Sequence, residues 1–355
     1  MTRVSLPIDH WPAIHRERWV AAQQPAGFLE PDKPASHWSP DRRTMVEAAY
    51  GRWLAFLDRN DALDPFCEPG ERANEPRLRA FVAELQARVA PASAAMIIAA
   101  LLRMLAVLEP ERDWTFLAQV RRHLNRTAKP SRDKRSRIVA AADLYELGIR
   151  LMETWADARP QQIYKATRYR DGLILSLLIS CPIRLKNLAA LVIGRHLVFD
   201  GNAYRLTLTA EETKTSRPYV AAVPQELTSY IDQWLRVHRP TLQSIATADA
   251  HDGSVGGYLW IDRWGHSMSA RAIQHQVWWR TRQAFGKPIW PHLFRDCAVT
   301  ELVDCAPAEI EIAPDLLGHA DLRTTRKHYI QAQGMTAHAR IQEMVARRRA
   351  AARGT

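Results

Sequence analysis

The feature that most constrains the fold is a short strand-rich interval with helical patterns on both sides. HLVF at residues 196–199 and YRLTLT at residues 204–209 flank the turn pair Asp200-Gly201 and predict a β-hairpin. A polar turn, EETKTSR, leads to a third strand, PYVAAVP, which Pro224 ends. Apolar residues elsewhere mostly follow helical spacing. The sequence therefore predicts a mostly α chain with a small antiparallel β-sheet inside an α+β domain.

The part of the chain before residue 128 carries helical patterns and no strand pattern. The whole chain has 355 residues, which is enough for about two domains. Ser39 and Pro40 are typical N-cap and first-turn residues. The helices expected here cover residues 40–60, 75–89, 92–108 and 114–125. We predict a helical bundle over residues 41–127. Residues 1–40 contain six Pro and three Trp and are interpreted as an arm or extension rather than a core.

Neither a membrane span nor a disulfide framework is indicated. The most apolar stretch, Ala95 to Leu108, is interrupted by Arg103 and is shorter than the roughly 20 residues that a bilayer span needs. The N-terminus lacks the apolar region of a secretory signal. Four Cys are scattered without a CxxC pair, which argues against disulfides and a cysteine-rich zinc site. We expect a cytoplasmic protein with no membrane partner.

Basic residues are in excess and are clustered. Lys and Arg number 49 against 38 Asp and Glu, a net charge of +11. The segment from Arg121 to Arg137 holds eight Lys or Arg and one Asp, and the tail from Arg340 to Arg353 holds five Arg and one Glu. An excess of this kind favours a polyanionic partner such as nucleic acid. A generally basic soluble protein without a polyanionic partner is the simpler alternative, but clustering of the charges at a linker and a terminus favours nucleic acid. We interpret residues 128–138 as a basic linker. The expected DNA contacts in this segment are Arg121, Arg122, Arg126, Lys129, Lys134 and Arg135.

The remaining chain, residues 139–335, is interpreted as a second domain, followed by a basic tail helix over residues 336–355. Helices are expected before the sheet at residues 140–158 and 166–180, and after it at residues 225–237, 270–285, 291–303 and 322–332. The helix at 270–285 carries Arg271 and Arg280 and is a candidate for contact with a DNA groove. A solvated basic helix face is an equally good interpretation.

Six side chains suited to phosphate chemistry stand in separate blocks of this second domain. Taken singly, each is more simply structural: an Arg is usually a surface ion-pair partner, and a helical Tyr is usually a core aromatic. His292 and Arg295 are three residues apart and therefore share a helix face. In chain order the six are Arg184, Lys214, His292, Arg295, His319 and Tyr329.

In that order, the arginine in SCPIRLKNL, the lysine on a β-turn, PHLFR, LLGH and the later tyrosine resemble the tyrosine recombinase family, also called phage integrases. The resemblance covers roughly residues 137–332, and the helical bundle before it matches the family's core-binding domain in architecture only. Three positions depart from the family pattern. Asn187 stands where an acid is common, and Asp296 replaces a frequent histidine. His328 occupies the usual nucleophile position, so that Tyr329 is one residue late.

The resemblance implies roles for the six residues that the chemistry supports. Arg184 and Arg295 would bind the non-bridging oxygens of a phosphodiester and stabilise its transition state. Tyr329 would be the nucleophile, with His292 as its acid–base partner and His319 donating to a phosphate oxygen. Lys214 would protonate the leaving 5′-oxygen. A 3′-phosphotyrosyl link conserves the bond energy, so neither a metal nor ATP is expected. A zinc site of His292, His319, His328 and Cys297 fits no ligand spacing.

The same resemblance implies the partners. We expect double-stranded DNA with inverted-repeat recombination sites, bound by a homotetramer or by a heterotetramer with related recombinases, and accessory proteins are possible. The tail helix would dock on a neighbouring protomer; a self-packed or frayed terminal helix is the alternative. Two other activities remain open: DNA relaxation like that of a type IB topoisomerase, and a catalytically silent DNA-binding protein of the same fold. The DNA sequence of the target and the role of residues 1–40 do not follow from the sequence.

Overall fold

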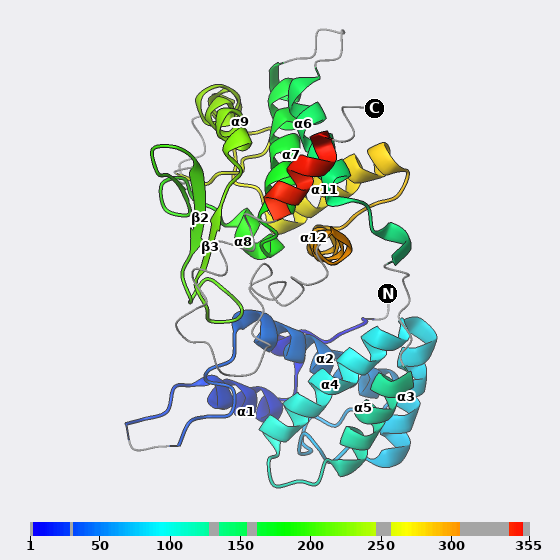
Figure 1. Cartoon of the computed structure of the whole chain (residues 1–355). Coiled ribbons are helices and arrows are strands. Elements are labelled where there is room, and N and C mark those ends of the chain that lie inside the picture. The colour runs from blue at the N-terminus through cyan, green and yellow to red at the C-terminus, as the bar shows by residue number, and fades with distance from the viewer. Residues whose placement is uncertain are drawn as a thin grey trace, which may run out of the picture. The chain divides into compact units, whose positions relative to one another are not determined.

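The computed structural model describes residues 3–28, 31–127, 135–154, 162–245, 257–305 and 341–350. The contacts divide the chain into two compact units, Met1–Asp133 and Lys134–Thr355. Figure 1 shows the first unit in blue and cyan, and the second from green to red. Each unit has its own hydrophobic core, so the two are described separately.

The first unit is helical. Its α-helices are α1 (Ala13–Gln23), α2 (Pro40–Arg59), α3 (Glu75–Arg88), α4 (Pro91–Leu108) and α5 (Thr115–Thr127), preceded by a 3₁₀ turn at Ile8–His10. The Ser39 and Asn74 side chains cap α2 and α3 by accepting hydrogen bonds from backbone N–H groups, and Pro occupies the first turn of both helices. The four helices predicted from the sequence are confirmed.

The interpretation of residues 1–40 as an arm outside a core is wrong for much of that segment. Trp19 of α1 is fully buried, and its indole N–H donates to the Glu47 carboxylate of α2 at 2.8 Å. Trp11 is also buried and lies edge-on against Tyr50, with ring centroids 5.0 Å apart. Burial of large aromatic side chains with their N–H groups satisfied is a strong stabilising contribution. The many prolines shape this segment's path without keeping it out of the core.

Helix α4 is the most apolar element. By length and hydropathy it is the one described helix that could cross a membrane, and half of that window is buried inside the protein. Ile98, Leu101 and Met104 are buried in the core of the first unit. The core helix of a globular domain passes the same test, so α4 is weak evidence for a membrane span.

The second unit contains the predicted sheet. Strands β1 (Leu197–Phe199), β2 (Tyr204–Leu208) and β3 (Tyr219–Ala222) form an antiparallel sheet in the order β1-β2-β3. Leu206 of β2 pairs with Leu197 on one side and with Ala221 on the other. Tyr204, Leu206 and Leu208 alternate with less buried residues, as expected for a strand with one face on a core. The predicted fold class, mostly α with a small antiparallel sheet, is confirmed.

Helices beside this sheet build most of the core of the second unit. They are α6 (Ala141–Glu153), α7 (Gln162–Ser180), α8 (Leu185–Ala189), α9 (Thr228–Gln233), α10 (Arg239–Gln243), α11 (Ala270–Phe285) and α12 (Pro291–Cys305), with a π-helical turn at Trp234–His238 and short 3₁₀ turns at Arg135–Arg137 and Gln225–Leu227. Helices α6 and α7 cross closely because Gly148 and Gly172 face each other. A Cβ atom built on Gly148 would lie 2.7 Å from the Gly172 carbonyl oxygen. Figure 1 shows α7 beside α6, with α11 and α12 on the side away from the sheet.

Residues 341–350 form a helix that packs on the second unit of the same chain. Ile341, Met344 and Val345 are buried in its core. Arg348 pairs with the buried Glu301 of α12 at 3.0 Å. Of the two interpretations of the tail, the structure shows the self-packed one for these ten residues. Docking on another protomer stays a prediction.

Candidate active site

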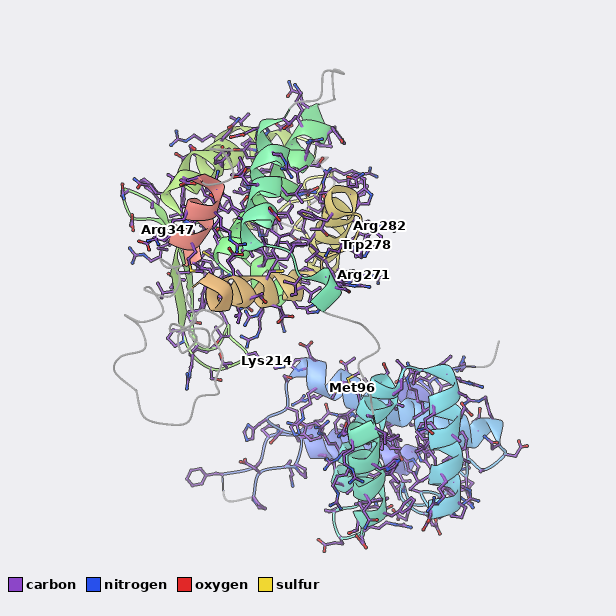
Figure 2. All side chains as sticks on the ribbon, turned by 45° about the vertical axis from the view of Figure 1, so that its right-hand side comes forward. Met96, Lys214, Arg271, Trp278, Arg282 and Arg347 are labelled. Atoms are coloured by element: carbon purple, nitrogen blue, oxygen red, sulfur yellow. The ribbon has the colours of Figure 1, made fainter. Side chains whose placement is uncertain are left out.

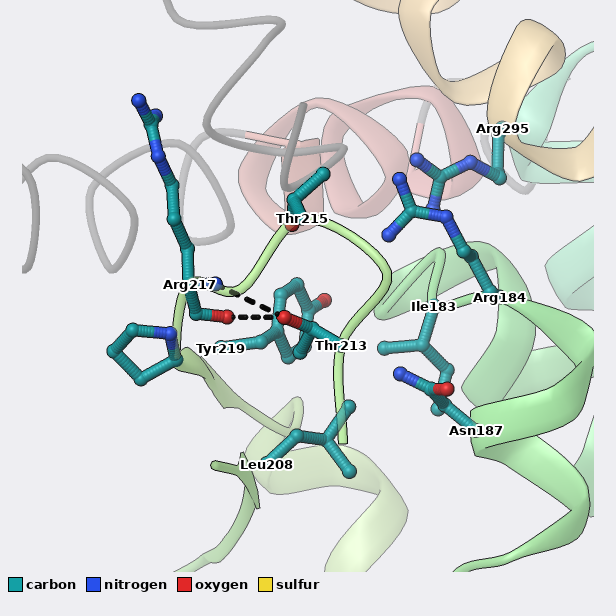
Figure 3. A pocket seen from close by; sticks show the side chains of 10 residues that line it. Ile183, Arg184, Asn187, Leu208, Thr213, Thr215, Arg217, Tyr219 and Arg295 are labelled. Carbon is teal, nitrogen blue, oxygen red and sulfur yellow. Dashed lines mark hydrogen bonds between the residues drawn. The ribbon is translucent and has the colours of Figure 1, made fainter. Parts of the chain in front are cut away.

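Arg184 is placed by the chain reversal between two helices. Helix α7 ends at Ser180, and Pro182 follows within two residues, where a helix cannot continue. Arg184 is the N-cap residue of α8, with an extended backbone. Its side chain is partly buried and enters a pocket (Figure 3).

Arg295 reaches the same pocket from α12. Its guanidinium donates a hydrogen bond to the carbonyl oxygen of Pro182, two residues before Arg184. Figure 3 shows the two guanidinium groups next to each other, facing the turn that carries Thr215. Burial, and then the neighbouring charge of Arg184, lower the pKa of Arg295 to about 10. The protein therefore holds two cations together at a cost in free energy, which a bound anion would offset.

The pocket around the two arginines is basic and polar. Among the described residues that line it, three are Arg and none is Asp or Glu. The lining residues are Ile183, Arg184, Asn187, Leu208, Thr213, Thr215, Arg217, Pro218, Tyr219 and Arg295. Two forked guanidiniums beside hydroxyl groups match the needs of a phosphate group, which accepts several charge-assisted hydrogen bonds. The pocket is a candidate phosphodiester site.

Lys214 lies in the turn between β2 and β3. Its side chain is exposed, at the end of the hairpin labelled in Figure 2, and both of its neighbours, Thr213 and Thr215, line the pocket. The Thr213 hydroxyl ties the two arms of the turn together: it donates to the Arg217 carbonyl at 2.6 Å and accepts from the Arg217 N–H at 3.1 Å (Figure 3). Ser216, with a φ of 51°, completes the reversal. The predicted lysine is therefore on a short, internally bonded turn beside the arginines.

His292 is the second residue of α12, after the Pro291 that opens the helix. It is exposed and stands one helical turn before Arg295, as the sequence spacing predicts. His319, His328 and Tyr329 lie outside the described residues. The structure therefore brings Arg184, Arg295 and the Lys214 turn to one pocket, with His292 on the helix that supplies Arg295.

The DNA contacts predicted from the sequence differ in their exposure. Arg122 and Arg126 on α5 and Arg271 on α11 are exposed, and Arg121 is partly buried. Lys129 and Lys134 lie outside the described residues, as does the side chain of Arg135 at the start of the 3₁₀ turn.

Arg280 is a correction. It is 5% exposed, and its guanidinium pairs with Asp171 of α7 at 2.9 Å. It lies on the inner side of α11, whereas Arg271, Trp278 and Arg282 project from the outer side (Figure 2). Arg280 is therefore buried in an ion pair within the second unit instead of exposed as a DNA contact would be.

Two residues that line the pocket are not predicted from the sequence. Arg217 and Tyr219 follow Lys214 by three and five residues and return toward the pocket because the turn reverses the chain. Burial raises the pKa of Tyr219 well above its ordinary value, and the positive charge of Arg295 opposes that rise. The available signal was the turn itself, since residues on both arms of a short hairpin meet at its end. Among the described residues, no three His, Cys, Asp or Glu side chains are grouped as metal ligands would be.

Comparison with known proteins adds a family. Residues 150–335, more than half of the chain, match the phage integrase family model. The chain is 28% identical over 158 residues to the tyrosine recombinase XerC of Pseudomonas fluorescens. This aligned region covers 44% of this chain and 47% of the relative. It is 24% identical over 212 residues to the tyrosine recombinase XerD of Pseudomonas aeruginosa, covering 58% and 64%. The matched region is about half the length of the XerC relatives.

The fold is also similar to a solved structure. The crystal structure of the XerH site-specific recombinase bound to its difH substrate, a pre-cleavage complex, aligns with a TM-score of 0.55. The alignment covers 93% of this chain and 96% of that chain at 12% identity. This similarity concerns the fold alone.

Proposed function

Because the chain belongs to the phage integrase family, we propose that it is a site-specific DNA recombinase that cuts and rejoins strands through a tyrosine nucleophile. The observation that carries the proposal is the pairing of Arg184 and Arg295 in a pocket whose described lining holds no acid. Two partly buried cations kept side by side are poorly stable alone and well suited to a bound phosphodiester. The family match spans the residues that build this pocket.

The two arginines act on the charge that develops at phosphorus. Attack on a phosphodiester adds negative charge to the non-bridging oxygens, and preorganised guanidiniums stabilise that charge more than the ground state. Removal of one such donor costs about 100- to 1,000-fold in rate in comparable sites.

The proton transfers are assigned to Lys214, His292 and Tyr329. The Tyr329 phenol loses its proton to His292 as its oxygen bonds to phosphorus, the bond from phosphorus to the 5′-oxygen breaks, and Lys214 gives a proton to that oxygen. His319 donates a hydrogen bond to a phosphate oxygen. The products are a 3′-phosphotyrosyl link and a 5′-hydroxyl, and attack by another strand's 5′-hydroxyl reverses the step. No external energy source or metal is needed for this sequence.

The partner is double-stranded DNA, in keeping with the net charge of +11. A recombinase of this type joins two duplexes, so we expect two inverted-repeat sites held by four protomers, all of this chain or some of a related recombinase. Such a reaction takes place on cytoplasmic DNA. The solved XerH complex contains its own DNA substrate, which supports a DNA partner for this fold.

Covalent capture tests the proposal. Nicked suicide duplexes, made from the DNA flanking the gene, are incubated in EDTA with wild type, with Tyr329→Phe and with Tyr164→Phe as an exposed tyrosine control. We expect an SDS-resistant adduct with wild type and with Y164F and none with Y329F. An adduct with Y329F would overturn the nucleophile. Binding without any adduct favours the silent DNA-binding protein, and relaxation of any supercoiled plasmid favours the topoisomerase-like activity.

A further inference from the structure

Glu212 attaches the Lys214 turn to the segment that follows α8. One carboxylate oxygen of Glu212 accepts a hydrogen bond from Nε2 of His196 at 2.9 Å. The other accepts from the backbone N–H of Thr209, also at 2.9 Å. The exposed Arg195 is a third partner. The Thr209 N–H and then His196 lower the pKa of Glu212, which keeps this carboxylate charged.

His196 passes the connection on to the backbone. It is 5% exposed, and its Nδ1 accepts a hydrogen bond from the Val192 N–H at 2.9 Å. Because a backbone N–H can only donate, Nδ1 carries no proton and Nε2 carries the proton that goes to Glu212. The ring is therefore a neutral imidazole with both nitrogens used. It joins a carboxylate of the turn to the main chain of the segment after α8.

This connection joins the two halves of the cation cluster. Arg184 is the N-cap residue of α8, which ends at Ala189, and Val192 follows three residues later. At the other end Glu212 stands two residues before Lys214. In between, the hydroxyl of Thr213 closes the turn. Only short, bonded segments separate the N-terminus of α8 from the lysine turn.

Resting on the proposed function, we propose that His196 and Glu212 are positioning residues that hold the Lys214 turn in register with Arg184. The lysine ammonium stands on a flexible stem of four carbons, so it is well placed for a proton transfer only if the backbone of Lys214 is fixed. With the turn anchored, the Lys214 ammonium meets the 5′-oxygen of the phosphodiester that Arg184 holds. Without the anchor, the arginines still bind the phosphate, but the leaving oxygen departs without a proton.

A purely structural His–Glu pair would act differently. Its loss would loosen the sheet and slow every reaction of the pocket to the same extent. Loss of positioning should instead slow only the reaction that needs the lysine proton. A substrate with sulfur in place of the bridging 5′-oxygen separates the two cases, because a thiolate leaves without protonation.

Single-turnover cleavage of matched oxygen and sulfur suicide duplexes tests this role. Lys214→Ala sets the benchmark, with a loss of about 100-fold or more on oxygen, the range of general-acid catalysis, and near-wild-type cleavage of sulfur. We expect His196→Asn, which retains an acceptor for Val192 but loses the donor to Glu212, to lose about 10-fold on oxygen and to regain wild-type rates on sulfur within about 2-fold. Glu212→Gln, of the same shape, should show the same pattern more weakly. Arg205→Ala, which removes an exposed pair between β2 and Asp200 in the same sheet, is the control and should change neither rate.

Equal losses on both substrates, or no loss on either, would overturn the proposal. Hydrogen–deuterium exchange in residues 210–216 gives a second measurement that needs no catalysis. H196N and E212Q should raise exchange there, and R205A should not. If wild type forms no adduct with either duplex, the proposed function fails, and exchange alone decides the inference: unchanged protection in H196N would then overturn it.

Discussion

Arg280 and Asp171 form a buried ion pair that joins α11 to α7, with Nε of the guanidinium 2.9 Å from the carboxylate. The second oxygen of Asp171 accepts from Arg170 at 2.7 Å, and Arg170 also donates to the carbonyl of Ile261 at 2.9 Å. One carboxylate therefore holds two guanidiniums and, through Ile261, the loop before α11. Helix α11 is followed in the chain by α12, which supplies His292 and Arg295.

Replacement of Arg280 should destabilise the second unit. Arg280→Met removes one of the two charges that offset the burial of Asp171, and breaking a buried pair from one side costs about 3–5 kcal/mol in the free energy of unfolding. Urea denaturation measures the loss. Arg282→Met, on the outer side of the same helix, is the matched control and should change stability by less than about 0.5 kcal/mol. A stable R280M with weakened DNA binding would restore Arg280 as a DNA contact.

The outer side of α11 should matter for DNA instead. Arg271 and Arg282 are exposed there, and Arg282 lies over the ring of Trp278 at 5.2 Å (Figure 2). Each phosphate contact contributes about 0.9 to the slope of log binding constant against log salt concentration. We expect the double replacement R271A/R282A to reduce that slope by about 1 to 2 and to leave the unfolding free energy unchanged. An unchanged slope in a filter-binding salt titration would show that this face does not touch the DNA backbone.

Arg295 should be required for cleavage and costly for stability. Its pKa is lowered to about 10 from an ordinary value of 12.5. At every pH below about 10 the charged Arg295 therefore lowers the free energy of unfolding, because the charge is less favourable in the folded protein than in the unfolded chain. Arg295→Gln removes that penalty but also the hydrogen bond to Pro182. We expect a net gain of about 1 kcal/mol in unfolding free energy, measured at pH 7 without DNA, and a loss of at least about 100-fold in cleavage. Arg205→Gln is the exposed control, and a destabilised R295Q would contradict the electrostatic argument.

Features governed by local rules were predictable from the sequence. The β1–β2 hairpin follows from the HLVF strand before the turn pair Asp200-Gly201 and from the alternating YRLTLT strand after it, and the start of α12 follows from Pro291. Local patterns do not predict the pairing of Arg184 with Arg295, because the two residues are far apart in the chain. The order of the motifs predicted it. Their resemblance to a known family supplied what no local pattern could.

Features that depend on distant partners were missed. Helical spacing puts Arg280 in the stripe of Ile273 and Val277, the buried side of α11, but only Asp171, far away in the chain, makes a buried arginine stable there. Trp11 and Trp19 are buried by helices that follow them, which a proline-rich segment does not disclose. Arg217 lines the pocket through the geometry of one turn, including a positive φ at Ser216, while its guanidinium points away from Arg184 and Arg295 (Figure 3).

The buried helix at residues 341–350 should contribute to stability within one chain. Ile341 is fully buried in the core of the second unit. Ile341→Ala should cost about 2–5 kcal/mol, the usual range for a buried large-to-Ala replacement. Arg347→Ala, on the exposed side of the same helix, is the matched control. Denaturation at several protein concentrations is the measurement: a loss that appears only at high concentration would mean that the tail packs on a neighbour instead.

Acid should weaken the second unit through His238. This side chain is buried and stacks on Tyr169 with ring centroids 4.1 Å apart, and burial lowers its pKa from 6.5 to about 4. Between these two values the unfolded chain binds a proton that the folded chain does not, so the unfolding free energy falls as the pH falls from about 6.5 to 4 and is independent of this group above 6.5. The loss should reach about 2–3 kcal/mol at pH 4. His238→Phe keeps the stacked ring without the titration, and its unfolding free energy should decline less over the same interval by about that amount. Parallel pH curves for the two proteins would show that His238 does not titrate with folding.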